Sequence, residues 1–110
     1  MTGKFVVSKM KNGEDYFVLK AGNGEVILTS EGYKSNAACM NGIESVRNNC
    51  GDEKCFEVKA AKDGREYFVL KAKNHQVIGS SQMYKSGSGC KNGMASVGRS
   101  APDAEIRDDR

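Results

Sequence analysis

The chain has 110 residues, a net charge of +3 at pH 7 and a hydrophobic fraction of 38%. This length is typical of one domain and is enough to bury a core. No apolar run approaches the ~20 residues of a membrane-spanning helix, and the first residues lack the apolar stretch of a secretory signal, so we expect a cytoplasmic protein without membrane contact. The small positive charge is shared by both halves, which argues against a basic nucleic-acid-binding arm.

The chain repeats itself at a shift of 51 residues, without a gap. The longest match places Tyr16-Phe17-Val18-Leu19-Lys20-Ala21 on Tyr67-Phe68-Val69-Leu70-Lys71-Ala72. Further on, Tyr33-Lys34-Ser35 matches Tyr84-Lys85-Ser86, and Cys39 matches Cys90. Self-similarity of this kind indicates an internal duplication.

Each repeat is expected to open with three short strands. The predicted strands are 5–8, 16–20 and 26–29 in the first repeat, and 56–59, 67–71 and 77–80 in the second. Phe56 and Val58 alternate with charged residues, the pattern of a half-buried strand. Asn12-Gly13 and Asp63-Gly64 supply residues suited to the tight turns between strands.

A helix is predicted to follow the strands in each repeat. Ser35 and Ser86 stand where an N-cap would accept a bond from a free backbone N–H. The apolar residues Cys39, Ile43 and Val46 have helical spacing, and Cys90, Met94 and Val97 repeat it.

The predicted helices contain Gly42 and Gly93, each costing about 1 kcal/mol relative to alanine. We therefore expect a close approach of the helix to the sheet at these two positions. The first helix should end near 48–49 and the second before Pro102. A last strand is expected at 104–107, and residues 108–110 should fray.

Neither repeat is long enough to form a secure core alone. We therefore expect one compact domain over 1–110, made of repeat 1 (1–51), repeat 2 (52–103) and a short C-terminal strand or tail (104–110). The predicted fold class is α+β. Its two βββα(β) repeats share one antiparallel sheet with two helices on one face, related by a pseudo-twofold axis.

Several of these motifs resemble those of the YegP-like proteins, small bacterial proteins of one or two such units. The resemblance rests on the run at 16–31, then Tyr33-x-Ser35, then Asn41-Gly42-Ile43-x-Ser45-Val46, and the second repeat fits the same pattern. It implies tandem βββαβ units that share one sheet and exchange their last strands. Single-unit relatives would dimerise, so this chain is expected to be a monomer that imitates a dimer. In that scheme, 56–59 closes the first unit while opening the second, and 104–107 closes the second.

The two repeats depart from each other in the helix. Ala37-Ala38 becomes Ser88-Gly89, and Arg47 becomes Gly98. The second helix has thereby lost helix formers and is expected to be the less stable one. The family has no established activity, so the resemblance implies a fold and no function.

We expect no metal, cofactor or catalytic residue. Cys39 and Cys90 fit core packing. Cys50 and Cys55 have a spacing that suits zinc but lack a second pair of ligands, and a reducing compartment disfavours a disulfide between them. His75 has no paired carboxylate or second histidine and is expected in an exposed turn.

Strand alternation predicts a possible binding face on the side of the sheet away from the helices. Tyr16, Lys20, Tyr67 and Lys71 should lie there. Aromatic rings among lysines on an open sheet are typical of single-strand nucleic-acid binders. The small net charge and sparse aromatic residues argue against that use.

The sequence leaves three functions open. We favour a small, non-catalytic interaction module with an unidentified protein partner. The alternatives are a single-stranded nucleic-acid binder that uses Tyr16, Lys20, Tyr67 and Lys71, and an enzyme of unknown class. An exposed sheet edge could also take up a strand from a partner.

Overall fold

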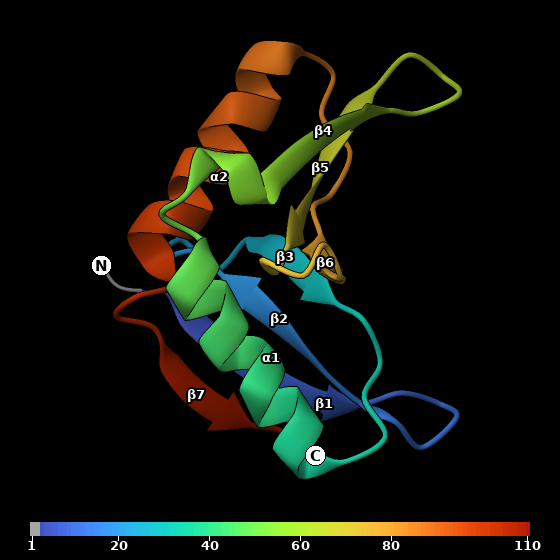
Figure 1. Cartoon of the computed structure of the whole chain (residues 1–110), viewed down its shortest axis with the longest axis vertical. Coiled ribbons are helices and arrows are strands. Elements are labelled where there is room, and N and C mark those ends of the chain that lie inside the picture. The colour runs from blue at the N-terminus through green and yellow to red at the C-terminus, as the bar shows by residue number, and fades with distance from the viewer. Residues whose placement is uncertain (1–2) are drawn as a thin grey trace.

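The computed structural model describes residues 3–110 and contains one mixed sheet with two helices (Figure 1). The first repeat forms β1 (Lys4–Lys9), β2 (Asp15–Lys20), β3 (Val26–Ser30) and α1 (Asn36–Asn49). A short 3-10 helix, η1 (Glu53–Cys55), leads into the second repeat: β4 (Phe56–Ala60), β5 (Glu66–Lys71), β6 (Val77–Ser80) and α2 (Gly87–Ser100). The chain ends with β7 (Glu105–Asp108). The predicted strands and helices are thus confirmed to within one or two residues.

The two repeats join at the centre of the sheet. The strand order is β4-β5-β6-β3-β2-β1-β7, so β3 and β6 meet in the middle. All neighbours are antiparallel except β1 and β7, which are parallel. The equivalent residues Thr29 and Ser80 are paired across the β3–β6 junction. The predicted pseudo-twofold arrangement therefore has its axis there.

The predicted N-caps are confirmed. Ser35 Oγ accepts a hydrogen bond from the N–H of Ala38 at 3.1 Å, and Ser86 Oγ accepts one from Gly89 at the same distance. The helices bury their apolar stripes against the sheet, and Cys39, Ile43, Cys90 and Val97 are fully buried. Core packing of Cys39 and Cys90 is therefore confirmed as well.

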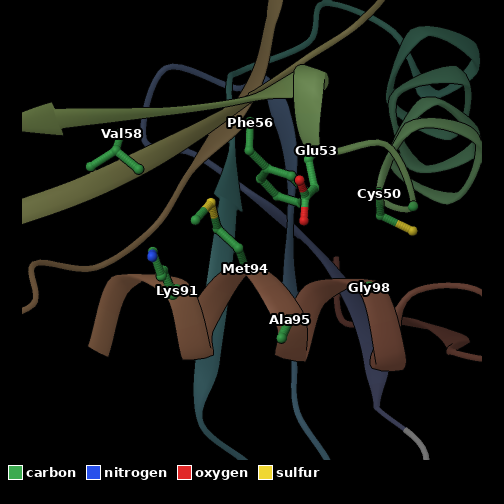
Figure 2. Close-up of a pocket in the computed structure, with 9 residues that line it drawn as sticks. Cys50, Glu53, Phe56, Val58, Lys91, Met94, Ala95 and Gly98 are labelled. Carbon is green, nitrogen blue, oxygen red and sulfur yellow. The ribbon is translucent and has the colours of Figure 1, made fainter. Parts of the chain in front are cut away.

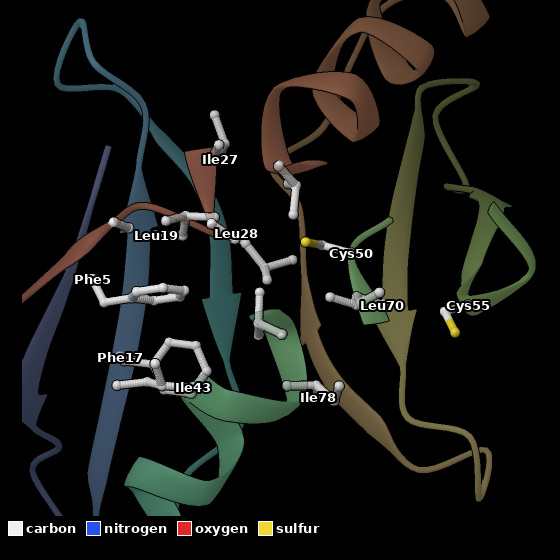
Figure 3. Packing of buried hydrophobic residues seen from close by; sticks show 14 of the residues in the cluster. Phe5, Phe17, Leu19, Ile27, Leu28, Ile43, Cys50, Cys55, Leu70 and Ile78 are labelled. Atoms are coloured by element: carbon white, nitrogen blue, oxygen red, sulfur yellow. The ribbon is translucent and has the colours of Figure 1, made fainter. Parts of the chain in front are cut away.

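Each repeat builds its core around three aromatic rings. In the first repeat, the ring of Phe17 lies edge-on to Phe5 at 5.6 Å and stacks with Tyr33 at 6.2 Å. In the second repeat, Phe68 lies edge-on to Phe56 at 5.5 Å and stacks with Tyr84 at 6.2 Å. Buried leucine and isoleucine side chains join the two trios into one continuous core (Figure 3).

The last strand is exchanged in one direction only. β7 pairs with β1 and so closes the first repeat, whereas we had expected residues 104–107 to close the second. β4 does not close the first repeat either: within residues 3–110 it pairs with β5 alone and forms the far edge of the sheet. The last strand of the second repeat is thus exchanged to the first repeat, but both predicted assignments are wrong: 104–107 does not close the second unit, and 56–59 does not close the first.

The connection between the repeats explains this asymmetry. A shift of 51 residues aligns β7 with residues 54–57. In the structure these residues end η1 and begin β4. No other segment of residues 3–110 pairs with the outer edge of β4.

The C-terminal residues are bound to the first repeat, so the expectation that they fray was wrong. The N–H of Asp109 donates to the carbonyl oxygen of Val7 at 2.8 Å. The guanidinium of Arg110 pairs with the buried carboxylate of Asp15 at 3.1 Å and with Asp108 at 2.6 Å. These contacts hold β7 against β1.

Neither helix within residues 3–110 is long and apolar enough to cross a membrane.

The close approach expected at the helix glycines is confirmed and can be tested at Gly93. A Cβ at this position would lie 2.8 Å from Tyr84 Cζ and 3.0 Å from Phe68 Cε2. We expect Gly93→Ala to lower the free energy of unfolding by about 1–3 kcal/mol in chemical denaturation, because the aromatic trio must shift. Gly51→Ala is the control, since a Cβ there meets no atom within 4 Å, and it should change stability by about 0.5 kcal/mol or less. Equal effects of the two variants would contradict the close-packing account.

The buried carboxylate of Asp15 predicts a pH dependence. The hydrogen bond from Lys9 holds the pKa of Asp15 below its usual range, and the charge of Arg110 acts in the same direction. A carboxyl group whose pKa is lower in the folded than in the unfolded state stabilises the fold at pH values above its unfolded-state pKa. This stabilisation is lost as the pH falls through the pKa of the folded state. Between about pH 5 and about pH 2, unfolding stability should therefore fall more steeply for the natural protein than for Asp15→Asn. Parallel stability–pH curves for the two proteins would contradict this role of Asp15.

Candidate functional site

The main concave surface lies between the free edge of β4 and α2 (Figure 2). We call it the β4–α2 groove, and its volume is about 640 Å³. It is lined by Cys50, Gly51, Glu53, Phe56, Val58, Lys91, Met94, Ala95 and Gly98. The residues from α2 have the spacing of one helix face, and Met94 points toward Phe56 across the groove.

The equivalent surface of the first repeat is covered. There Phe5 and Val7 are 0% exposed, and β7 lies beside them with Ile106 paired to Phe5 and Asp108 paired to Val7. In the second repeat, Phe56 is only partly buried and Val58 is 45% exposed. The groove therefore occupies the position beside β4 that β7 occupies beside β1.

A second difference deepens the groove on the helix side. Arg47 of α1 lies with its guanidinium 5.5 Å from the centre of the Phe5 ring. It donates to the carbonyl oxygen of Ala104 at 2.6 Å and so fastens the segment that leads into β7. Gly98 occupies the matching position of α2 and has no side chain to cover Phe56.

The backbone of β4 has hydrogen-bonding groups directed into the free edge. Phe68 of β5 donates its N–H to Ser81 Oγ at 2.9 Å, so this N–H points away from β4. Val58 lies opposite Phe68, and in an antiparallel pair of this kind the N–H and C=O of both residues point outward. The corresponding carbonyl in the first repeat, that of Val7, accepts the bond from Asp109.

Two charged residues lie at opposite ends of the groove. Glu53 precedes the start of β4 and lies at the end nearer Cys50, whereas Lys91 lies at the end nearer Val58 (Figure 2). The middle is apolar and is formed by Phe56 and Met94. The groove thus has an acidic end, an apolar centre and a basic end.

The structure places the predicted binding face on both halves of the sheet but does not bring its tyrosines together. The strand pairs put Val18, Thr29, Ser80 and Val69 in one row across the sheet. Tyr16 precedes Val18 by two residues, and Tyr67 precedes Val69 by two residues. Since β2 and β5 run in opposite directions, the two tyrosines lie on opposite sides of this row. Two strands lie between β2 and β5, which adds a lateral separation of about 14 Å.

The two lysines of that face differ in their surroundings. Lys71 forms an ion pair with Glu57, and the carboxylate of Glu57 partly neutralises the positive charge of Lys71. Lys20 lines a shallow pocket of about 440 Å³ with Lys4 and Arg107. The sequence analysis missed Lys4 and Arg107 because they meet Lys20 only through the β1–β2 and β1–β7 pairing.

The remaining residues considered for chemistry have structural roles. Burial raises the pKa of the Cys39, Cys50 and Cys90 thiols and so favours their neutral form, whereas a nucleophile needs the thiolate. All four cysteines are free thiols, and within residues 3–110 no group of three His, Cys, Asp or Glu residues could hold a metal ion. His75 lies in the β5–β6 turn with φ of 70°, where the first repeat has Gly24.

The sequence contained a signal for the groove. The change from Arg47 to Gly98 is visible in the repeat alignment, but we interpreted it as a loss of helix propensity. The change from Arg47 to Gly98 also leaves the Phe56 ring uncovered. This consequence could not be recognised before it was known that β7 pairs with β1 and not with β4.

The comparisons with known proteins agree with the duplication and the fold. Residues 11–57 and 61–108 each match the family described as a domain of unknown function, DUF1508. A UPF0339 protein of Pseudomonas aeruginosa is 48% identical over 109 residues, which cover 99% of each chain. The UPF0339 protein YegP of Yersinia pestis is 49% identical over 106 residues, which cover 96% of this chain and 95% of the relative.

Two solved structures have the same fold. The solution NMR structure of yegP from E. coli, a protein of unknown function, has a TM-score of 0.94 at 48% identity and covers 99% of this chain and 94% of its own. The solution NMR structure of a UPF0339 protein from Shewanella oneidensis has a TM-score of 0.91 at 49% identity, with 98% and 92% covered. With both repeats matched and relatives about half identical over nearly the full length, the chain belongs to the DUF1508 family of YegP-like UPF0339 proteins.

Proposed function

We propose that the protein is a non-catalytic binding module whose β4–α2 groove holds a segment of another protein. The observation that carries this proposal is the contrast between equivalent residues of the two repeats. Val7 is 0% exposed beside β7, whereas Val58 is 45% exposed beside an open groove. Exposed apolar side chains next to unpaired strand groups are the usual features of a protein–protein contact.

The chemistry of the groove supports binding over catalysis. Its two charged side chains, Glu53 and Lys91, lie toward opposite ends of the groove, with Phe56 and Met94 between them. A general acid–base pair needs groups that converge on the same reacting atom. Burial raises the pKa of the Cys50 thiol at the rim, which opposes a nucleophilic role.

A single-stranded nucleic acid is the second candidate ligand, bound through Tyr16, Lys20, Tyr67 and Lys71. The pocket formed by Lys4, Lys20 and Arg107 favours it, because the two lysines there could meet phosphate groups, whereas Arg107 is already paired with Asp109 at 3.0 Å. The separation of the tyrosines and the Lys71–Glu57 ion pair weigh against it. Binding of this kind would weaken steeply with salt and would shift the amides of β2 and not those of β4.

The groove proposal predicts the effect of Gly98→Arg, which restores the residue found at the matching position of α1. Peptides selected from a displayed library on the natural protein should bind Gly98→Arg at least tenfold more weakly, because the new side chain fills the groove over Phe56. The matched control is Asn92→Arg, which adds the same side chain to an exposed position of α2 outside the groove and should leave affinity unchanged.

Because a Cβ at Gly98 would lie 3.3 Å from the carbonyl oxygen of Cys50, both variants are checked by thermal unfolding and by their amide spectra. Val58→Thr, a change of nearly constant shape at an exposed site, provides a second test by removing an apolar contact. The proposal is wrong if selected peptides bind all these variants equally, or if the library contains no binder of the natural protein.

A further inference from the structure

We infer that the groove takes an extended peptide as an eighth strand, parallel to β4 and in the register that β7 adopts on β1. This inference rests on the proposed function and adds the mode of binding and the chemistry of the partner. It is argued from the first repeat, where the equivalent position is filled by the chain itself.

The β1–β7 pair provides the backbone template. There Phe5 is paired with Ile106 and Val7 with Asp108, and the N–H of Asp109 donates to Val7 at 2.8 Å. The internal repeat transfers this register to β4, where Phe56 and Val58 take the places of Phe5 and Val7. The Val58 carbonyl, which faces the free edge, would then accept the N–H of the peptide residue that corresponds to Asp109.

The side chains that line the groove define three positions of the peptide. The residue beside Phe56 corresponds to Ile106, and it would contact Met94 and the space above Gly98. This space is occupied by Arg47 in the first repeat, so an apolar side chain branched at its far end, such as leucine, fits the second. We call this residue the anchor.

The residues two before and two after the anchor lie on the same face of an extended strand. Because the peptide is parallel to β4, the residue two before lies at the Glu53 end and the residue two after lies at the Lys91 end. A basic residue at the first position and an acidic residue at the second complement these charges. The β7 segment has an acidic residue at this second position, Asp108.

The partner is therefore expected to present the pattern basic–x–apolar–x–acidic in an exposed, extended segment. The order of the charges selects the parallel direction, since a reversed peptide would place like charges together at both ends of the groove. The side chains between these positions face the opposite side of the sheet, where Glu57 is already paired with Lys71. The pattern makes no demand on them.

The test uses the capped peptide Lys-Thr-Leu-Thr-Asp-Thr and the ¹⁵N-labelled full chain. We expect amide shifts confined to β4, η1 and the Lys91–Gly98 face of α2. N-methylation of the last threonine removes the bond to Val58 and should weaken binding about tenfold. N-methylation of the aspartate is the matched control, since its N–H points away from β4, and should have a smaller effect. The reversed sequence, which has the same composition, should bind at least tenfold more weakly.

A charge reversal tests the assigned direction independently. Lys91→Glu should weaken binding of the peptide, and replacement of the peptide's aspartate by lysine should restore it for this variant only. Lys91 is an exposed residue, so the change leaves the core intact.

The outcomes separate the inference from the proposed function. Shifts in the groove with equal affinity for the forward and reversed peptides would overturn the parallel strand while leaving groove binding in place. Absence of binding by any of these peptides would overturn the inferred pattern, whereas the library selection decides the proposed function. Concentration-dependent shifts of β4 without peptide would assign the groove to a second copy of this chain and would also overturn it.

Discussion

The repeated unit of this protein has a position for a covering strand beside its first strand, but residues 3–110 fill this position in only one of the two units. The three aromatic rings of each unit pack between the sheet and a helix, and the outermost ring, Phe5 or Phe56, lies at the edge of this packing. β7 pairs with β1 beside Phe5, and Arg47 lies over the Phe5 ring and fastens the segment that leads into β7. Residues 54–57, which correspond to β7 in the repeat alignment, form the end of η1 and the start of β4 and so do not pair beside Phe56.

Because only one covering strand is present within residues 3–110, the two repeats, which share one fold, have different surfaces. The first repeat is closed by β7 and by the contacts of Arg110 with Asp15 and Asp108. The second repeat has an exposed edge strand, and such edges invite association with other strands unless they carry charged residues or are covered. Glu57 and Lys59 provide such charges on one side of β4, whereas the groove side is apolar at Phe56 and Val58. The edge is therefore protected on one face and open to a specific contact on the other.

Most of the fold could be predicted because each element occurs twice in the sequence. Ser35 and Ser86 identified both helix starts, and the alternation at Tyr16–Lys20 and Tyr67–Lys71 identified the buried faces of β2 and β5. Close packing at Gly42 and Gly93 followed from glycine in the same place of both helices. These are local signals, and the repeat made each of them stronger.

The candidate site could not be predicted in the same way, because it depends on long-range pairing. Nothing in the sequence of β7 states that it pairs with β1, nor that β4 is left at the edge. Arg47 and Gly98 differ visibly in the alignment, but the difference acquires its meaning only once Phe56 is known to lack a covering strand. Likewise, the four residues of the predicted open face share one side of the sheet, yet the antiparallel order of β2 and β5 separates Tyr16 from Tyr67.

The central claim is that no strand of residues 3–110 lies beside the outer edge of β4, whereas β7 lies beside the equivalent edge of β1. Residue-resolved amide hydrogen exchange of the free protein tests it through the matched pair Val7 and Val58, whose N–H groups both point away from the neighbouring antiparallel strand. The account predicts slow exchange for Val7, which is paired with β7, and exchange several orders of magnitude faster for Val58 at the open edge. Equal protection of the two amides would show that the β4 edge is already covered and would contradict the account.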